Sequence, residues 1–289
     1  VERPINIVDL LTHTSGLSYW FTNQHPVDAM YRKAELDKAR EKLSLEELTN
    51  FLAEFPLRHQ PGTRWSYSMA TDVLGRVIEV IEERSLFETL AERVLDPLGM
   101  TDTSFQISDK KIERLAACYT PEEGTLSPLL LEKPGESSYR SSRLQSGGGG
   151  LLSTMHDYHR FCKMLINGGE LEGERLLAEA TIQQMTSNQM GRLRVKPLIS
   201  AEPLMSNNAE FFPGSPKSWG LSFQINEQRE ATGRAAGTLM WAGLSNNYFW
   251  IDQANDVAGV MLTQILPFVD RQVMELLDAI EKAVYKSLS

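Results

Sequence analysis

The chain has 289 residues, of which 42% are apolar and 23% charged, a composition typical of a globular protein with a sizeable core. Its formal net charge of −9 argues against a nucleic-acid partner, because no basic stripe is available to neutralise phosphates. Two cysteines, Cys118 and Cys162, fit reduced thiols rather than a disulfide framework, and no apolar run approaches the ~18 residues of a membrane-spanning helix.

Helices and turns are expected in the first 57 residues. Residues 4–11 predict a short helix that ends before the turn-forming string HTSGL, residues 13–17. Residues 27–57 are charge-rich and helical, and Ser44 with Glu47 forms an S-x-x-E capping box. The charges of YRKAELDKAREK in this range are expected to form a solvated helix face.

A further helical stretch follows the Pro-Gly turn of HQPGTRW, residues 59–65. Apolar residues recur at helical spacing over 73–81, which predicts a helix that buries this stripe. A second capping box, Ser85 with Glu88, predicts another helix that runs through Leu95.

The middle of the chain is less regular. Residues 101–145 are polar and turn-rich and predict long loops with short strands. Four consecutive glycines follow at 147–150. Ser153 or Thr154 is then expected to cap a helix that ends at the glycine pair 168–169.

The last third predicts strands and a final helix. The strings SWGLSFQINE (218–227), GRAAGTLMWAG (233–243) and NYFWIDQANDVAGVMLTQ (247–264) predict an antiparallel meander, the last string being broken by a turn at 254–256. Residues 270–288 predict an amphipathic helix that lies on this sheet. The fold class is therefore mixed α/β, with an antiparallel sheet near the C-terminus and helices upstream.

The sequence motifs give little support for a metal site or a nucleotide site. His156 and His159 form an H-x-x-H pair, but no carboxylate or third histidine stands in a matching register. The glycines at 147–150 lack the Lys-Ser/Thr tail of a phosphate-binding loop. We therefore expect no metal and no cofactor.

A nucleophile is also hard to find in these residues. No G-x-S-x-G elbow exists, because the string of residues 243–245, Gly-Leu-Ser, continues into two asparagines. One S-x-x-K pair occurs, Ser108 with Lys111, but no helical pattern precedes it to hold hydroxyl and amine one turn apart. We do not expect Ser108 to be a nucleophile.

Several strings together resemble the serine β-lactamase-related superfamily. They are HTSGL (13–17), PGTRWSYSMATDVLG (61–75), LGMTDTSF (98–105), SGGGGLLST (146–154) and WAGLSNNYFWID (241–252), in the family's order. With FFPGSPKSWGLSF (211–223) they look most similar to its esterase branch, the family VIII carboxylesterases. The resemblance runs from the first residue to the last. It implies an α/β sandwich in which an antiparallel sheet carries terminal helices on one face and a helical subdomain on the other.

The resemblance implies acyl transfer. A serine attacks an ester carbonyl, an acyl-enzyme forms, and water releases the acyl group. Tyr67 matches the tyrosine of the family's Y-x-N element, which helps to move the proton. A phenol with a pKa near 10 acts as a base only with help from a nearby cation, which in the family is the S-x-x-K lysine. That motif lies upstream of HTSGL in the family, so we expect the chain to lack an N-terminal segment that carries it.

Two departures from the family bear on the substrate. Met69 replaces the asparagine of Y-x-N and removes a polar contact. Trp241, with Gly243, matches the third family motif, which begins with lysine in β-lactamases and penicillin-binding proteins. Because tryptophan cannot pair with the carboxylate of a β-lactam, the pocket should favour neutral esters. Leu244 would offer its backbone N–H to the oxyanion. We expect Trp241, Gly243, Leu244 and Met69 to contact substrate.

Other residues are expected to shape the site. His13 is expected to orient its turn by hydrogen bonds, and Gly148 and Gly149 to form a tight backbone beside the cleft. Without the resemblance, Tyr67 would be interpreted as an ordinary aromatic at a helix start and Trp241 as a core residue of a strand.

We therefore expect one β-lactamase-like domain over 1–289 that lacks its N-terminal segment, with a helical subdomain over about 1–210 and the sheet with its terminal helix over about 211–289. The expected function is that of a carboxylesterase-type serine hydrolase, with this chain alone inactive; the alternative is an inactive pseudoenzyme that serves as a binding or scaffold module. A small neutral ester is the expected partner, with no nucleic acid and no membrane, and the missing segment suggests a homo-oligomer or a complementing segment. No signal peptide is visible, but the N-terminus is not informative, so the compartment stays unknown, with the cytoplasm favoured.

Overall fold

The structure, a computed structural model, describes residues 1–40, 42–122, 124–130 and 138–288. Its largest sheet is antiparallel, and its five strands are ordered as they occur along the chain. They are β5 (Lys217–Trp219), β6 (Gln224–Asn226), β7 (Leu239–Gly243), β8 (Asn247–Asp252) and β9 (Val257–Met261). The predicted meander is confirmed. The string 218–227 forms two strands, because the Gly220 N–H bonds to the Phe223 carbonyl and closes a turn.

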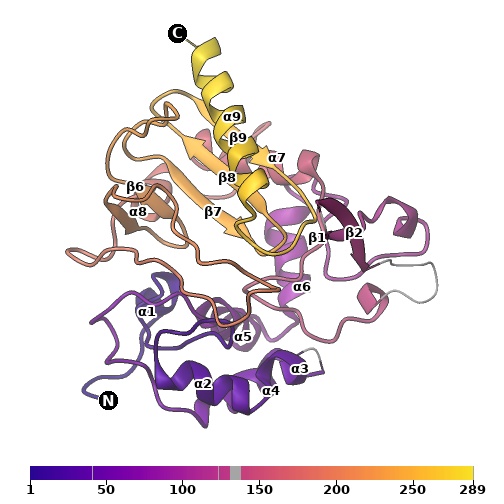
Figure 1. Cartoon of the computed structure of the whole chain (residues 1–289), viewed down its shortest axis with the longest axis vertical. Helices are drawn as coiled ribbons and strands as arrows, with labels where there is room; N and C mark the ends of the chain where they lie inside the picture. Colours follow the sequence, from indigo (N-terminus) through magenta and orange to yellow (C-terminus); the bar gives the residue numbers. More distant parts are fainter. Residues whose placement is uncertain (41, 123, 131–137, 289) are drawn as a thin grey trace.

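Helices cover both faces of this sheet. Side chains alternate along β8. Tyr248 and Trp250 pack in one hydrophobic cluster with α9 (Arg271–Ser287), whereas Phe249 and Ile251 pack in another with α7 (Met155–Ile166). Figure 1 shows α9, in yellow, running over the sheet. The α/β sandwich expected from the sequence is confirmed.

Most other helices lie in the first 95 residues. They are α1 (Ile7–Leu11), α2 (Pro26–Lys33), α3 (Leu36–Arg40), α4 (Leu45–Ala53), α5 (Ala70–Glu82), α6 (Leu86–Leu90) and a π-helical turn, Ala91–Leu95; α8 (Glu179–Met185) comes later. Both predicted capping boxes are present, at Ser44 and Ser85. In Figure 1, α1 to α5 form a layer at the end of the molecule opposite the C-terminus. Glu41 of the predicted charged helix face lies outside the described residues.

The middle of the chain forms short hairpins, as expected. β1 (Cys118–Glu122) pairs with β2 (Thr125–Leu130), and β3 (Glu170–Leu171) pairs with β4 (Glu174–Arg175). Short 3-10 helices span Ile112–Arg114 and Ser138–Arg140, and residues 131–137 of the predicted loop lie outside the described part. Thr154 is the N-cap of α7, and Cys118 and Cys162 are free thiols.

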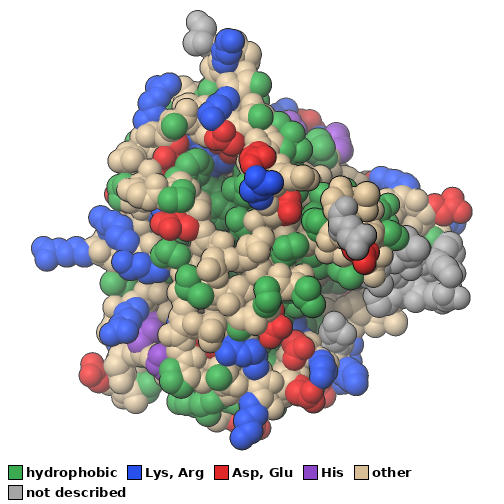
Figure 2. Space-filling model, in the orientation of Figure 1, with side chains coloured by type: hydrophobic (Ala, Val, Ile, Leu, Met, Phe, Trp, Pro, Cys, Tyr) green, Lys and Arg blue, Asp and Glu red, His purple; other side chains and the backbone are tan. Residues whose placement is uncertain are grey.

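Along the sequence, the boundary expected near residue 210 falls after α1 to α6 and before the strands of the large sheet. α7 lies on the N-terminal side of that boundary, yet it packs against β8 and β9. No helix of the described residues combines the length and the apolar character needed to cross a membrane. On the face shown in Figure 2, acidic and basic side chains are interspersed.

A buried ion pair ties α9 to the loop between β6 and β7. The Arg234 guanidinium, with 0% exposure, donates to both carboxylate oxygens of Glu281, which is 1% exposed. Its third nitrogen lies 3.1 Å from the Met240 sulfur, and its carbon lies 5.3 Å from the centre of the Trp250 ring. Charges buried this deeply are tolerated because each satisfies the other.

Replacing Glu281 with glutamine should therefore strongly destabilise the fold. The substitution leaves the Arg234 charge buried and unpaired, which lowers the free energy of unfolding by about 3–5 kcal/mol. Urea denaturation followed by circular dichroism measures this loss. Lys282→Ala is the matched control, because it removes an exposed pair with Asp278 from the neighbouring position, and it should leave the midpoint nearly unchanged. Equal midpoints for the two variants would contradict the prediction.

Candidate active site

Tyr67 lies in a loop that is bonded along its length to the HTSGL turn. The Ser66 N–H donates to the His13 carbonyl at 2.8 Å, and the Met69 N–H donates to the Ser18 carbonyl at 3.2 Å. The Gly62 N–H donates to the carbonyl of Thr14 at 2.8 Å. These bonds join segments about fifty residues apart in sequence, so they fix the backbone on both sides of Tyr67.

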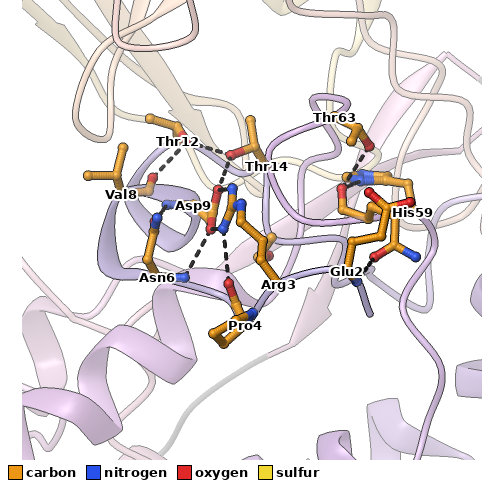
Figure 3. Close-up of polar contacts among 12 residues, drawn as sticks. Glu2, Arg3, Pro4, Asn6, Val8, Asp9, Thr12, Thr14, His59 and Thr63 are labelled. Atoms are coloured by element: carbon orange, nitrogen blue, oxygen red, sulfur yellow. Dashed lines mark hydrogen bonds and ion pairs between the residues drawn. The ribbon is translucent and has the colours of Figure 1, made fainter.

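The HTSGL turn is itself anchored to the carboxylate of Asp9 (Figure 3). Two nitrogens of Arg3 donate to Asp9 at 2.6 and 2.8 Å, the Asn6 N–H donates at 2.9 Å, and the Thr14 hydroxyl donates at 3.2 Å. Gly16 adopts φ +89°, and a Cβ there would lie 2.4 Å from the His59 carbonyl oxygen. The turn therefore needs both the carboxylate and the glycine.

His13 packs against Tyr67 as a neutral ring. It is 2% exposed, and its centroid lies 4.7 Å from that of Tyr67 and 5.2 Å from that of Trp219. Its Nδ1 lies 3.4 Å from the Ser68 hydroxyl. Burial lowers the pKa of His13 to about 3, so the imidazole is uncharged at neutral pH. His13 packs on the Tyr67 ring, and its carbonyl accepts the Ser66 N–H; the turn-orienting role expected of its side chain stays a prediction.

Tyr67 and Trp241 meet in space. The Trp241 indole N–H donates to the Tyr67 hydroxyl oxygen at 3.2 Å, and the ring centroids are 4.9 Å apart. Burial raises the pKa of the Tyr67 phenol above its usual value, and the charge of Asp72 raises it further, while the Trp241 hydrogen bond lowers it. The phenol is therefore protonated at neutral pH, and a nearby cation would be needed before it could act as a base.

Two residues that the sequence analysis missed lie beside Tyr67. The Tyr19 ring lies 5.2 Å from the Tyr67 ring, at an interplanar angle of 35°. Burial first, and then the neighbouring Tyr67 and Asp72, raise the pKa of Tyr19 well above its usual value. Asp72, in the first turn of α5, is 1% exposed. Asp72 lies on the buried side of α5, in an otherwise apolar stripe, and a carboxylate at such a position in the sequence could have indicated a site residue.

Two glycines of the run 147–150, Gly147 and Gly148, lie close to α5 and to the Tyr19 hydroxyl. A Cβ on Gly147 would lie 2.0 Å from the Thr71 carbonyl oxygen, and one on Gly148 would lie 2.9 Å from Asp72 Oδ2 and 3.0 Å from the Tyr19 hydroxyl. A Cβ on Gly149 would meet nothing within 4 Å among the described residues. The close approach expected of Gly148 is present, whereas Gly149 contacts nothing that requires a glycine.

The other three residues expected to contact substrate lie in two different places: Gly243 and Leu244 at the end of β7, and Met69 in the core. Gly243 ends β7, pairing with Asn247, and the exposed Leu244 follows it. No acceptor among the described residues takes the Leu244 N–H. Met69 is fully buried in the core of the helical layer. The structure thus brings Tyr67 and Trp241 together, keeps Gly243 and Leu244 on the same strand end, and directs Met69 into the core.

The S-x-x-K pair of Ser108 and Lys111 lies in a turn. The Lys111 ammonium donates to the Thr101 carbonyl at 2.7 Å and pairs with Asp102 at 2.7 Å. Its donors are engaged away from the Ser108 hydroxyl. Within the described part of the chain, histidine, cysteine and carboxylate side chains form no group of three that could hold a metal ion.

A model of the Beta-lactamase family matches residues 1–282. The chain belongs to the Beta-lactamase family. Protein Rv1367c of Mycobacterium tuberculosis is 32% identical over 271 residues, which cover 92% of this chain and 64% of that protein. The lovastatin esterase of Penicillium rubens is 29% identical, with 99% of this chain and 71% of that enzyme covered. The chain therefore spans less than two thirds of the length of the first of these relatives.

Among the solved structures similar to this chain, EstCE1 is described as a hydrolase with promiscuous acyltransferase activity. It superposes with a TM-score of 0.78 at 26% identity, covering 99% of this chain and 73% of that one. Esterases and acyltransferases thus recur among the similar proteins, and the resemblance inferred from the sequence motifs is confirmed.

The glycine run yields a matched pair of variants. Gly147→Ala should destabilise the fold, because the new methyl group collides with the backbone of α5 at Thr71. Gly149→Ala should be tolerated, because its Cβ position is open. Thermal unfolding of the two variants measures the difference. The prediction is wrong if both melt at the same temperature.

The Asp9 anchor should make stability depend on pH. Burial of Asp9 opposes ionisation, but the Arg3 and Asn6 donors outweigh it and lower the pKa of the carboxyl below its usual value. A lowered folded-state pKa contributes stability that is present above the unfolded pKa and is lost as the pH falls through the folded one. Asp9→Asn should therefore lower the melting temperature at pH 7 and flatten its fall in acid. An unchanged acid limb in Asp9→Asn would count against this anchor.

Proposed function

We propose that the site around Tyr67 and Trp241 handles the proton in the hydrolysis of neutral carboxylic esters by serine acyl transfer. The observation that carries the proposal is the hydrogen bond from the Trp241 indole to the Tyr67 hydroxyl. It joins the phenol to the middle of β7, the strand that Leu244 follows; the Leu244 N–H has no acceptor among the described residues. The esterase and acyltransferase names of the relatives support the same reaction class.

The proposed reaction has two steps. A serine hydroxyl attacks the ester carbonyl, its proton passes by way of the phenol to the departing alkoxide, and the alcohol leaves an acyl-serine. Water then attacks the acyl-serine, gives up one proton to regenerate the serine hydroxyl, and releases the carboxylic acid. The Leu244 N–H would stabilise the oxyanion in both steps, with a second donor beside the serine.

Trp241 supports a neutral substrate. The indole N–H is committed to Tyr67, and the ring lies 4.6 Å from the Trp219 ring and 6.0 Å from the Phe211 ring. Aromatic rings offer no cation to a substrate carboxylate, and desolvating that carboxylate would cost free energy. Lys217, which lines the same pocket, donates instead to the carbonyls of Phe212 and Ser215. Gly243 and Leu244 would line the same strand end.

The hydroxyl and the amine of the proposed reaction would come from residues other than 1–289, on a complementing segment or a longer form of the protein. Within the 289 residues the one S-x-x-K pair, Ser108 with Lys111, is held in a turn. Among the residues that the structure describes, no cation lowers the pKa of the Tyr67 phenol. By this proposal the chain alone performs no covalent catalysis.

The purified 289-residue chain should not hydrolyse p-nitrophenyl acetate well above buffer, because binding and one oxyanion donor leave only residual stabilisation. A longer form with an in-frame S-x-x-K should hydrolyse it, and Tyr67→Phe should lower kcat there by about 10²–10⁴-fold. Release of p-nitrophenolate measures both. Turnover by the 289-residue chain that disappears in Tyr67→Phe would overturn the assignment of the missing groups.

The alternative is a binding module that has kept the pocket without the chemistry. The full burial of Met69, where the family has a polar asparagine, favours it. A longer form that contains S-x-x-K but gives no turnover with neutral esters would support this alternative. Gel filtration of the chain distinguishes a homo-oligomer from a monomer that awaits a complementing segment.

A further inference from the structure

A small cavity beside Trp241 is lined by buried hydrogen-bond donors. Trp65, Lys217 and Gln224 line it together with Trp241. Lys217 lies in β5 and Gln224 in β6, where Gln224 pairs with Trp219. Because side chains alternate along a strand, Lys217, Trp219 and Gln224 share one face of the sheet. That face packs in the hydrophobic cluster that contains Trp65, Trp219 and Trp241, so an ammonium and an amide lie beside aromatic rings.

The indole of Trp65 and the amide of Gln224 have no acceptor. Both nitrogens are buried without a hydrogen-bond partner among the described residues. The two residues are 6% and 1% exposed, respectively. Leaving a buried donor unpaired costs free energy. Packing alone therefore does not explain why Gln224 carries a polar side chain at this position.

Lys217 adds a positive charge to the wall of the cavity. Its ammonium is 5% exposed and donates to the carbonyls of Phe212 at 2.9 Å and Ser215 at 2.8 Å. An ammonium has a third donor. The Glu210 carboxylate lies 3.8 Å away, which is too long for a hydrogen bond. The third donor thus has no acceptor at hydrogen-bond distance in the described structure.

The charge and the size of the cavity restrict what it can bind. Glu210 also lines it and would repel a ligand carboxylate, so a neutral acceptor is favoured over an anion. The volume is about 10 Å³, the least that one water-sized group requires. The cavity is partly open, with the exposed Lys196 and Glu210 among its lining residues. One oxygen atom of a larger neutral molecule therefore fits it.

We propose that this cavity is an acceptor subsite, which takes a carbonyl oxygen of a bound ester other than the carbonyl that is attacked. Trp241 lines the cavity and donates its indole N–H to Tyr67, so one side chain borders both the subsite and the phenol. The carbonyl oxygen accepts hydrogen bonds from Trp65 and Gln224 and faces the Lys217 ammonium. The subsite thus selects neutral esters that carry a second carbonyl group, such as keto-esters and diesters. Its link to hydrolysis rests on the proposed function, whereas binding of the carbonyl does not.

The test uses two neutral esters of similar shape with the 289-residue chain. Methyl levulinate carries a ketone oxygen, and methyl isocaproate has a methyl group in its place. The tryptophans are isotope-labelled on the indole nitrogen, and the Trp65 resonance is assigned by its loss in Trp65→Phe. Methyl levulinate should bind about tenfold more tightly than methyl isocaproate, because it alone supplies the second acceptor. It should also move the Trp65 indole proton downfield.

Two other indoles are controls in the same spectra. The nitrogens of Trp20 and Trp250 are also buried without a partner among the described residues, but neither residue lines the cavity. Their resonances should stay in place during both titrations. A Trp65 resonance that moves no more than these two, or equal affinities for the two esters, would overturn the subsite.

Gln224→Met removes the amide donor at nearly the same volume. It should lower the affinity for methyl levulinate to that for methyl isocaproate. The melting temperature should stay the same or rise, because an unpaired buried amide is lost. Gln183→Met is the control, since Gln183 is exposed on α8 and does not line the cavity, and it should keep the preference. A folded Gln224→Met that keeps the full preference would also contradict the proposal.

These binding measurements are independent of turnover, so they separate the two proposals. If the preference for methyl levulinate occurs and no form of the protein hydrolyses esters, the subsite stands and the proposed function fails. If a longer form hydrolyses both esters with equal kcat/KM, the function stands and the subsite fails.

Discussion

The hydrogen bond between the Trp241 indole and the Tyr67 hydroxyl joins the two halves of the fold. It links β7 of the sheet to the loop before α5, across 174 positions of sequence. The His13 ring packs on Tyr67 and the Trp219 ring packs on Trp241. The Trp219 indole N–H donates to the Leu11 carbonyl, and the His13 carbonyl accepts the Ser66 N–H. A shift of the sheet relative to the helical layer would break this contact, so the geometry of the site depends on the docking of the two layers.

The surroundings of that contact explain its electrostatics. Aromatic rings exclude water and lower the local dielectric, which disfavours charge on His13, Tyr67 and Tyr19 alike. The side chains of His13, Tyr67 and Tyr19 are therefore uncharged at neutral pH. Neutral groups bind a neutral ester without paying for the desolvation of a charge. The same environment raises the pKa of the Tyr67 phenol, so the phenol is a poor base in the absence of a nearby cation.

Backbone proximity is the second constraint on the site. Gly147 and Gly148 allow the loop to touch α5 and the Tyr19 hydroxyl, and Gly16 allows the HTSGL turn to lie against the backbone of His59. These contacts bring chain segments together at distances that exclude a Cβ. Gly149 belongs to the same run but makes no such contact among the described residues. Adjacent glycines therefore differ in whether the fold has room for a Cβ.

The sequence by itself determined the capping boxes at Ser44 and Ser85, the antiparallel meander and the amphipathic α9, because caps and periodicity act over a few residues. Its motifs also pointed to Tyr67 and Trp241. Only the tertiary structure decided that Met69 turns into the core, that Tyr19 packs on the Tyr67 ring, and that Asp72 lies buried against Gly148. Those outcomes depend on contacts between residues about fifty or more positions apart, which no local pattern encodes.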